Sequence, residues 1–212
     1  MAEVITDRKA NEVRVSLDGR ELVIKVDKPF TARIQNNEYV WVESSRYEPM
    51  EPITEDDRRD ILYDLDGNNI YVFSRGDNSV EFMGHMINID VRVWCVTYYP
   101  PKKLLLVCGK DGDEYSSPSG LYIYNEDGEL VREFKEPALF DMVSVSELEP
   151  RLTAFMRERG VTERSGFSLC GVSCSERNRV ELDVRAVNDY TVLHALMNMD
   201  DYTVRIVGYD AR

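Results

Sequence analysis

Side chains able to carry out acid–base or nucleophilic chemistry are scarce in this sequence. It has two histidines, His85 and His194, among 212 residues. A Ser-His-Asp or Cys-His site would have to use one of them, because histidine is the base in both arrangements. The sequence contains no G-x-S-x-G nucleophile elbow. We therefore interpret both histidines as structural and predict no catalytic residue.

One turn contains the alternating oxygen ligands that calcium sites use. Asp64, Asp66 and Asn68 lie at alternate positions of the segment YDLDGNN. An EF-hand loop also needs glycine at its sixth position and glutamate at its twelfth. Counted from Asp64, those positions hold Asn69 and Arg75. We therefore interpret this segment as a hairpin turn and predict no calcium site.

The four cysteines form no recognisable metal or disulfide pattern. Cys170 and Cys174 are four residues apart in CGVSC, and on an extended strand they would face the same side about two pleats apart. That separation is too long for a direct disulfide without a turn. Zinc would need two more ligands, and Cys95 and Cys108 lie far away in sequence. We predict no metal and no cofactor, and a redox role for Cys170 and Cys174 stays open.

The chain is strongly acidic, and most of the excess lies toward its N-terminus. The net charge is −13 and the isoelectric point about 4.7. Residues 1–138 contain 27 acidic and 17 basic side chains, whereas residues 139–212 contain 12 and 9. Such a field repels nucleic acids and anionic membranes and attracts a basic partner. We predict neither nucleic-acid nor membrane binding, and plain solubility is the alternative reason for the charge.

Our leading hypothesis is a non-enzymatic protein-interaction protein. It would neutralise a basic partner, as an inhibitor or immunity-type protein neutralises a cationic toxin. Tyrosine is favoured at protein interfaces because its ring buries area while its hydroxyl stays hydrated. The two longest predicted loops carry both acidic residues and tyrosines. The predicted contact residues are Tyr47, Asp56, Asp57, Asp60, Asp111, Asp113, Glu114 and Tyr115.

Two other function classes stay open. One is a small-molecule-sensing regulatory module that holds an effector in its C-terminal half. The other is a hydrolase that pairs a loop carboxylate with His85 or His194. We expect a cytoplasmic location, because no run approaches about 20 apolar residues and the segment MAEVITDRKANE is polar. Neither the identity of the partner nor the oligomeric state is predicted.

Three Asp-Gly turns organise the predicted strands. They lie at residues 18–19, 66–67 and 127–128 between apolar or aromatic stretches, which is the pattern of antiparallel hairpins. The hairpin at 121–134, LYIYNEDGELVREF, is similar to hairpins of β-propeller blades, but the chain has room for only two or three such blades, too few to close a ring. Residues 91–98 and 104–108 are the most apolar strands and are expected at the centre. Residues 1–10 are expected to fray.

After Pro137 the pattern changes to a mixture of helix and strand. A short strand is predicted at 142–145, followed by a helix from Ser146, where Ser146 and Glu149 form a capping box, to Gly160. A second helix is predicted after Asn188 or Asp189. Its apolar face would consist of Val192, Leu193, Leu196 and Met197.

The predicted fold class is therefore α+β. An antiparallel β-rich domain of hairpins occupies residues 1–138, and a smaller α+β domain occupies residues 139–212. With further strands at 167–172, 180–187 and 202–207, the order in the second domain is β-α-β-β-α-β, which resembles the ferredoxin-like sandwich.

Overall fold

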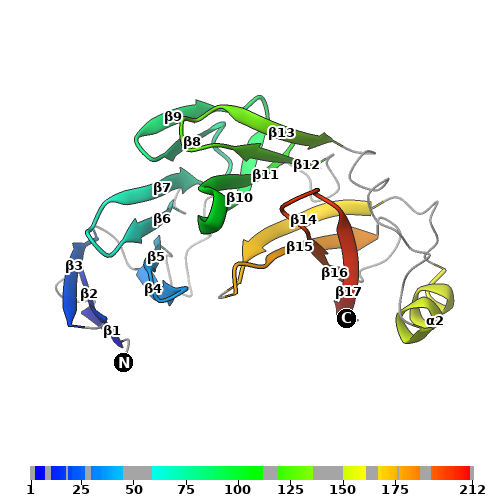
Figure 1. The fold of residues 1–212 in the computed structure, drawn as a ribbon, viewed down its shortest axis with the longest axis horizontal. Helices are drawn as coiled ribbons and strands as arrows, with labels where there is room; N and C mark the ends of the chain where they lie inside the picture. Colours follow the sequence, from blue (N-terminus) through cyan, green and yellow to red (C-terminus); the bar gives the residue numbers. More distant parts are fainter. Residues whose placement is uncertain are drawn as a thin grey trace, which may run out of the picture. The chain divides into compact units, whose positions relative to one another are not determined.

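A computed structural model shows a chain made almost entirely of antiparallel strands (Figure 1). The strands form four antiparallel sheets, which we call sheets A to D in chain order. The structure describes residues 3–7, 11–17, 19–26, 30–44, 59–111, 119–135, 150–160, 167–175, 177–186 and 192–210.

The predicted α+β fold class is wrong, and so is the ferredoxin-like arrangement of residues 139–212. A ferredoxin-like sandwich places two helices on one face of a sheet. Residues 167–210 instead form a four-stranded antiparallel meander in which each strand pairs with the next in the chain. Within the described ranges there is one α-helix, α2 (Pro150–Glu158), and it precedes this meander.

Unit 1, the first of two compact units, comprises residues 1–93 and 126–128. It contains the three-stranded sheet A and the six-stranded sheet B, both with their strands in chain order. Sheet A consists of β1 (Glu3–Asp7), β2 (Glu12–Leu17) and β3 (Arg20–Lys25). Sheet B consists of β4 (Phe30–Gln35), β5 (Tyr39–Ser44), β6 (Arg59–Asp64), β7 (Asn69–Ser74), β8 (Ser79–Phe82) and β9 (His85–Asn88).

Sheets A and B share a small apolar core. Its fully buried members are Val13 and Val15 of β2, Ile24 of β3, and Val40 and Val42 of β5. Buried and exposed side chains alternate along β2, which is the period that a strand with one buried face requires. The alternation that predicted this strand is therefore the same one that builds the core.

The first strand corrects the expectation that residues 1–10 fray. Glu3–Asp7 pair with β2, from Glu3 opposite Ser16 to Asp7 opposite Glu12. Four of the five side chains of β1 are exposed. The strand is therefore held by its backbone hydrogen-bond ladder rather than by an apolar face, and the amino-acid pattern carries little sign of it.

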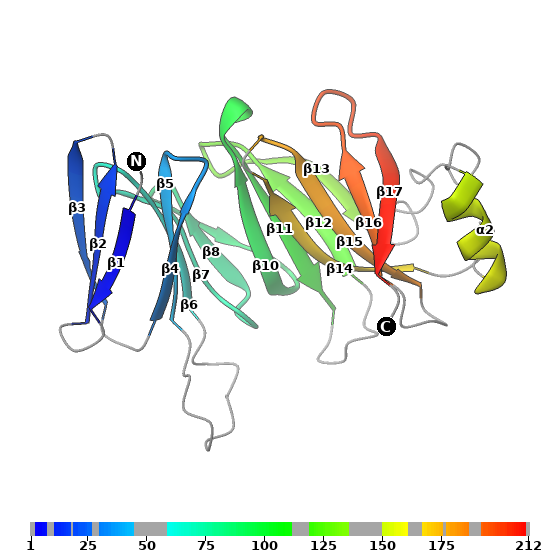
Figure 2. The same ribbon diagram turned by 90° about the horizontal axis from the view of Figure 1, so that it is seen from below.

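Unit 2 comprises residues 94–125 and 129–212 and contains sheets C and D (Figure 2). Sheet C consists of β10 (Arg92–Tyr99), β11 (Leu104–Lys110), β12 (Ser119–Tyr124) and β13 (Leu130–Lys135), with the 3-10 helix η2 (Pro100–Lys102) between β10 and β11. Sheet D consists of β14 (Phe167–Cys174), β15 (Val180–Ala186), β16 (Val192–Met197) and β17 (Val204–Asp210).

Residues from sheets C and D together build a large apolar core. It includes Leu106 and Leu121 from sheet C and Leu182 and Leu193 from sheet D. All seven residues of β11 are buried, so this strand has no solvent face. Its apolar run correctly predicted an inner strand, whereas β10, expected beside it at the centre, lies at the edge of sheet C.

The three predicted Asp-Gly hairpins join β2 to β3, β6 to β7 and β12 to β13. Gly67 and Gly128 have positive φ angles of 86° and 79°, which glycine adopts without strain. A Cβ atom at Gly128 would also lie 3.3 Å from that of His85. A side chain at Gly128 is therefore disfavoured both by the backbone and by β9.

The helix predicted after residue 188 is wrong, because β16 (Val192–Met197) occupies this segment. Leu193, Ala195 and Met197 are buried, with half-buried residues between them. The larger apolar residues alone fit a helical stripe, but the small Ala195 completes a strand alternation. Every residue of β16 pairs with β15 on one side and β17 on the other. Pairing with both neighbouring strands therefore shows that residues 192–197 form a strand and not a helix.

The first predicted helix is present as α2, and Gly160 follows it with a φ of 67° that suits a C-terminal cap. The predicted capping box of Ser146 and Glu149, the strand at 142–145 and the domain boundary at residue 138 lie outside the described residues. In the described part of the chain, no helix has both the length and the apolarity needed to cross a membrane.

Candidate functional site

Two of the eight predicted contact residues are described, Asp60 and Asp111. Asp60 is half-buried on β6 in unit 1, and Asp111 is exposed directly after β11 in unit 2. The other six lie outside the described residues: Tyr47, Asp56, Asp57, Asp113, Glu114 and Tyr115. Their gathering into one surface stays a prediction.

Asp60 stands opposite a second carboxylate. Strands β5 and β6 are antiparallel, and Glu43 of β5 is the register partner of Asp60. Side chains directly opposite each other in such a pair have Cβ atoms about 5 Å apart. These two acids are at the strand ends that lead into and out of residues 45–58. The pair concentrates negative charge at the base of that segment, and Glu43 was not among the predicted contact residues.

His194 on β16 bridges carboxylates on both neighbouring strands. Its Nδ1 is 2.8 Å from Oδ1 of Asp183 on β15, and its Nε2 is 3.2 Å from Oδ2 of Asp210 on β17. Because both ring nitrogens face a carboxylate oxygen, the arrangement favours the doubly protonated ring, which cannot act as a general base. His85 is exposed on β9. The hydrolase alternative therefore gains no support from either histidine.

The pKa of His194 is raised above its ordinary value of 6.5. Burial of the ring is the largest single influence and lowers it, but the hydrogen bonds and charges of Asp183 and Asp210 together outweigh burial. The side chain is 39% exposed, so it lies on the open face of sheet D. There it joins three strands through two ion pairs.

Asp64 closes the hairpin turn that resembles a calcium loop. Its Oδ1 accepts hydrogen bonds from the backbone N–H groups of Asp66, at 2.9 Å, and Asn68, at 2.8 Å. Its Oδ2 accepts one from the Asn68 side-chain amide at 2.9 Å. The carboxylate is thus occupied in holding the turn. In the part of the chain that the structure describes, no three metal-ligating side chains gather in one place.

All four cysteines are free thiols. A β-bulge between Leu169 and Gly171 interrupts the ladder at Cys170, so strand alternation does not run unbroken from Cys170 to Cys174. Burial raises the pKa of Cys174 to about 11. A hydrogen bond with Cys95, together with burial, raises the pKa of Cys108 well above its ordinary value. The thiols of Cys108 and Cys174 are therefore weak nucleophiles at neutral pH.

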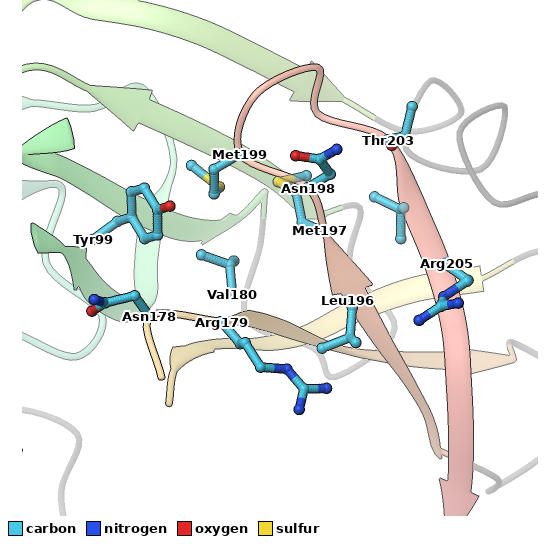
Figure 3. A pocket seen from close by; sticks show the side chains of 11 residues that line it. Tyr99, Asn178, Arg179, Val180, Leu196, Met197, Asn198, Met199, Thr203 and Arg205 are labelled. Atoms are coloured by element: carbon cyan, nitrogen blue, oxygen red, sulfur yellow. The ribbon is translucent and has the colours of Figure 1, made fainter. Parts of the chain in front are cut away.

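A pocket of about 700 Å³ lies at one end of sheet D (Figure 3). The turns from β14 to β15 and from β16 to β17 are at the same end of this antiparallel meander, and both contribute to the lining. The polar lining consists of Tyr99, Asn178, Arg179, Asn198, Thr203 and Arg205. The apolar lining consists of Val180, Leu196, Met197, Met199 and Val204.

The β16–β17 turn that forms one wall of this pocket is closed by its own hydrogen bonds. The Asn198 N–H donates to the Thr203 carbonyl at 2.8 Å, and the Tyr202 N–H donates to the Asn198 carbonyl at 2.7 Å. One oxygen of Asp201 accepts from the N–H and the hydroxyl of Thr203, at 3.0 and 2.7 Å. This part of the wall is therefore well defined.

Lys102 of η2 fastens the same turn from the side. Its Nζ donates to the Met199 carbonyl at 2.6 Å and to Oδ1 of Asp200 at 2.7 Å. The hydrogen bond to Asp200 raises the pKa of Lys102. The ammonium group therefore stays charged and attaches η2 to the pocket wall.

The sequence pattern did not reveal this pocket. The turn at Asn198 carries a clear signal, since Asn and Asp residues form side-chain-to-backbone turns. We predicted a helix, with Met197 on its apolar face, directly before this turn. A strand at 192–197 would have placed this turn at the same sheet end as the turn at Asn178.

Comparisons with known proteins do not assign the chain. No protein-family model matches it, and no curated protein does. Among solved structures, "KlHsv2 with loop 6CD replaced by a Gly-Ser linker" is similar at 12% identity, over 99% of this chain and 81% of that chain, with a TM-score of 0.36. With so low a TM-score, this likeness contributes nothing to the fold or to the function.

Proposed function

We propose that this chain is a non-enzymatic binding protein that engages a basic protein partner, in the manner of an inhibitor or immunity-type protein that neutralises a cationic toxin. The observation that carries the proposal is the pairing of Glu43 with Asp60 at the ends of β5 and β6. The intervening residues 45–58 contain five acidic and two basic side chains. Residues 43–60 together therefore contain seven acidic and three basic side chains.

The distribution of charge between the compact units supports the same proposal. The residues of unit 1 include 21 acidic and 12 basic side chains, and those of unit 2 include 18 and 14. A field of this sign accelerates encounter with a positively charged protein and is screened by salt. This charge distribution supports residues 43–60 of unit 1 as the part of the predicted contact surface to test first, ahead of Asp111, Asp113, Glu114 and Tyr115.

Calorimetric titration with the most basic protein encoded beside this chain tests the proposal. We expect binding that weakens at least tenfold between 50 and 300 mM NaCl, because added salt screens the attraction between opposite charges. The triple variant Asp56→Asn, Asp57→Asn, Asp60→Asn should bind at least tenfold more weakly and should lose most of the salt dependence.

A second triple variant provides a control with the same change of charge. Glu3, Glu21 and Glu38 are exposed and belong to unit 1. Their replacement by glutamine should leave the affinity within about twofold of the original, as expected for charges remote from the contact. Equal losses in the two triple variants, or binding that does not respond to salt, would overturn the proposed site.

We further propose that the chain works in the cytoplasm. Its four cysteines are too few to form a disulfide framework for 212 residues. Fractionation of cells that express a tagged full-length chain tests this: recovery with the cytosolic fraction is expected, and recovery from the medium would contradict it.

A further inference from the structure

Two thiols on neighbouring strands of sheet C point toward the same strand of sheet D. The Sγ of Cys95 on β10 accepts a hydrogen bond from the Val172 N–H at 3.3 Å. The Sγ of Cys108 on β11 donates to the Leu169 carbonyl at 3.9 Å. Val172 and Leu169 both belong to β14. The two sulfur atoms therefore lie on the same face of sheet C, the face that packs against β14.

The hairpin of β10 and β11 places these two cysteines opposite each other. The strands are neighbours in sheet C (Figure 2), and β10 ends at Tyr99 whereas β11 begins at Leu104. Cys95 lies four residues before the end of β10, and Cys108 lies four residues after the start of β11. Residues at equal distances from the turn of a regular antiparallel hairpin face each other. The two thiols also form a hydrogen bond with each other.

This arrangement satisfies the distance that a disulfide requires. Residues directly opposite each other in an antiparallel pair have Cα atoms about 4.5–5.5 Å apart. A disulfide joins Cα atoms that are roughly 4.4–6.8 Å apart. Two cysteines in opposite positions can therefore be joined without moving either strand.

The two cysteines differ in their access to solvent. Cys95 is half-buried, whereas Cys108 is completely buried. A small oxidant therefore reaches Cys95 first, and the Val172 N–H stabilises negative charge that develops on its sulfur. The hydrogen bond with Cys95, together with burial, keeps the pKa of Cys108 high, so this thiol is a poor target for the oxidant. Its contact with Cys95 nevertheless holds it in position to react with that neighbour.

We propose that Cys95 and Cys108 form an oxidation site at which hydrogen peroxide converts the two thiols into a cross-strand disulfide. The Cys95 thiolate attacks one peroxide oxygen, so that an S–O bond forms and the O–O bond breaks. The departing hydroxide takes up the proton released by Cys95, which gives water and a sulfenic acid. The Cys108 sulfur then attacks the Cys95 sulfur, so that the S–S bond forms and the S–O bond breaks. The second hydroxide takes the Cys108 proton, and the products are one disulfide and two water molecules.

Cys170 on β14 is the alternative partner for Cys108. It is half-buried, and it is close enough for its charge to raise the pKa of Cys108. Its own Sγ, however, donates to the Ser168 carbonyl of the same strand at 3.5 Å. Cys95 instead lies on the strand that pairs with β11. All these thiols belong to unit 2, whereas residues 43–60 belong to unit 1, so this proposal and the proposed partner site can each fail alone.

Peptide mapping distinguishes the possible disulfides, because trypsin cleaves after lysine and arginine. The cysteine-containing peptides are 93–102 with Cys95, 104–110 with Cys108, and 165–177 with Cys170 and Cys174. The full chain is treated with hydrogen peroxide, its remaining thiols are blocked, and the digest is analysed by mass spectrometry. Peptide 93–102 joined to 104–110 should be at least tenfold more abundant than any other linked pair. Linkage of 104–110 to 165–177 instead, or oxidation of Cys95 without linkage, would overturn the proposal.

The same treatment in urea shows whether the folded hairpin selects the pair. The preference for 93–102 joined to 104–110 should fall when the strands are unfolded, because the two thiols are then no longer held in contact. A preference that persists unchanged in urea would mean that closeness in sequence selects the pair, and the structural basis of the proposal would be lost.

Single variants assign the two steps. Cys108→Ser should leave a sulfenic acid on Cys95 that dimedone traps, whereas Cys95→Ser should leave Cys108 unoxidised. Cys174→Ser is the matched control, since Cys174 is also buried but belongs to neither step. This control should form the disulfide at the original rate, and circular dichroism verifies that each variant is folded. Oxidation of Cys108 in Cys95→Ser, or loss of the disulfide in Cys174→Ser, would contradict the assigned roles.

The disulfide should also fasten an edge strand to a buried one. β10 lies at the edge of sheet C, and its neighbour β11 is buried along its whole length. Amide hydrogen exchange in β10 should therefore slow at least tenfold after oxidation, because local opening of that strand is restricted. Reduction with dithiothreitol should restore the original rate. Exchange that does not change on oxidation would show that the bond does not constrain β10.

Discussion

The two compact units differ in both charge and core. Unit 1 has the larger acidic excess and 16 buried apolar residues among those described, five of them in the core shared by sheets A and B. Unit 2 is closer to neutral and has 24, of which 17 form the core shared by sheets C and D. Hydrophobic burial is the main stabilising contribution to folding, whereas excess charge of one sign opposes compaction.

The difference teaches that acidic charge and apolar burial are concentrated in different units of this chain. The acidic strand ends of β5 and β6 belong to the more acidic unit. The pocket lies at the end of the sheet that contributes most to the large core.

The largest expected change in the free energy of unfolding comes from a substitution in the core of unit 2. Leu182 is completely buried in sheet D. Leu182→Ala should lower the free energy of unfolding by about 2–5 kcal/mol, because it removes apolar contacts and leaves a cavity. Urea denaturation followed by circular dichroism measures this change.

The same variant tests whether the two units differ in local stability. Amide hydrogen exchange should accelerate more in β11 and β14–β17 than in β2 and β5, since opening free energies follow the local core. Val13→Ala, in the core of unit 1, is the companion variant and should show the opposite distribution. A uniform acceleration in both variants would mean that the two cores open as one.

Substitution of His194 is expected to lower the free energy of unfolding by a smaller amount that depends on pH. Its raised folded-state pKa means that its stabilisation is fully present below the unfolded pKa of 6.5 and is lost as the pH rises through the folded pKa. His194→Gln should therefore destabilise the protein by about 0.2–1 kcal/mol at pH 5.5, a value typical of exposed ion pairs, and by less at pH 8.5. Thermal unfolding at the two pH values measures the difference.

A double-mutant cycle with Asp210→Asn sharpens this prediction. The coupling between His194 and Asp210 should be measurable at pH 5.5 and should disappear at pH 8.5, because the interaction requires the imidazolium. A coupling energy that is equal at both pH values would show that a neutral hydrogen bond, not an ion pair, joins β16 to β17.

The last prediction requires no substitution, because the native cysteine thiols report local opening of the chain. All four cysteines belong to unit 2, so thiol labelling of the unaltered chain detects opening of that unit alone. Burial raises the pKa of Cys174 to about 11, so little thiolate is present at pH 7.5. Cys174 and Cys108 should react with iodoacetamide much more slowly than half-buried Cys170, as peptide mass spectrometry would show. Rapid labelling of Cys174 would contradict the tight packing of sheet D.

The hairpins could be predicted from the sequence, because their signals are local. An Asp-Gly pair between alternating strands defines both the turn and the register, as in β2–β3, whose ladder runs without a shift. The centre of sheet C was also predictable, since the apolar run of β11 leaves no polar face. The alternation of β2 likewise defined its buried side.

The errors arose where the decisive interactions are not local. The apolar residues of β16 fit a helix as well as a strand, and only the ladders to β15 and β17 separate the two. Strand β1 has almost no buried side chain to mark it. The pocket could not be predicted because its lining comes from two turns and from strands β15 to β17, and misplacing β16 removed the sheet end at which they meet.

The bonds from Lys102 to Met199 and Asp200 have a consequence for anything that enters the pocket. A ligand loses affinity when it must first immobilise a loose segment of its host. Because Lys102 already holds this turn in the absence of a ligand, less binding free energy is lost in ordering it. Lys102 would thus raise the affinity of a molecule in the pocket without contacting that molecule.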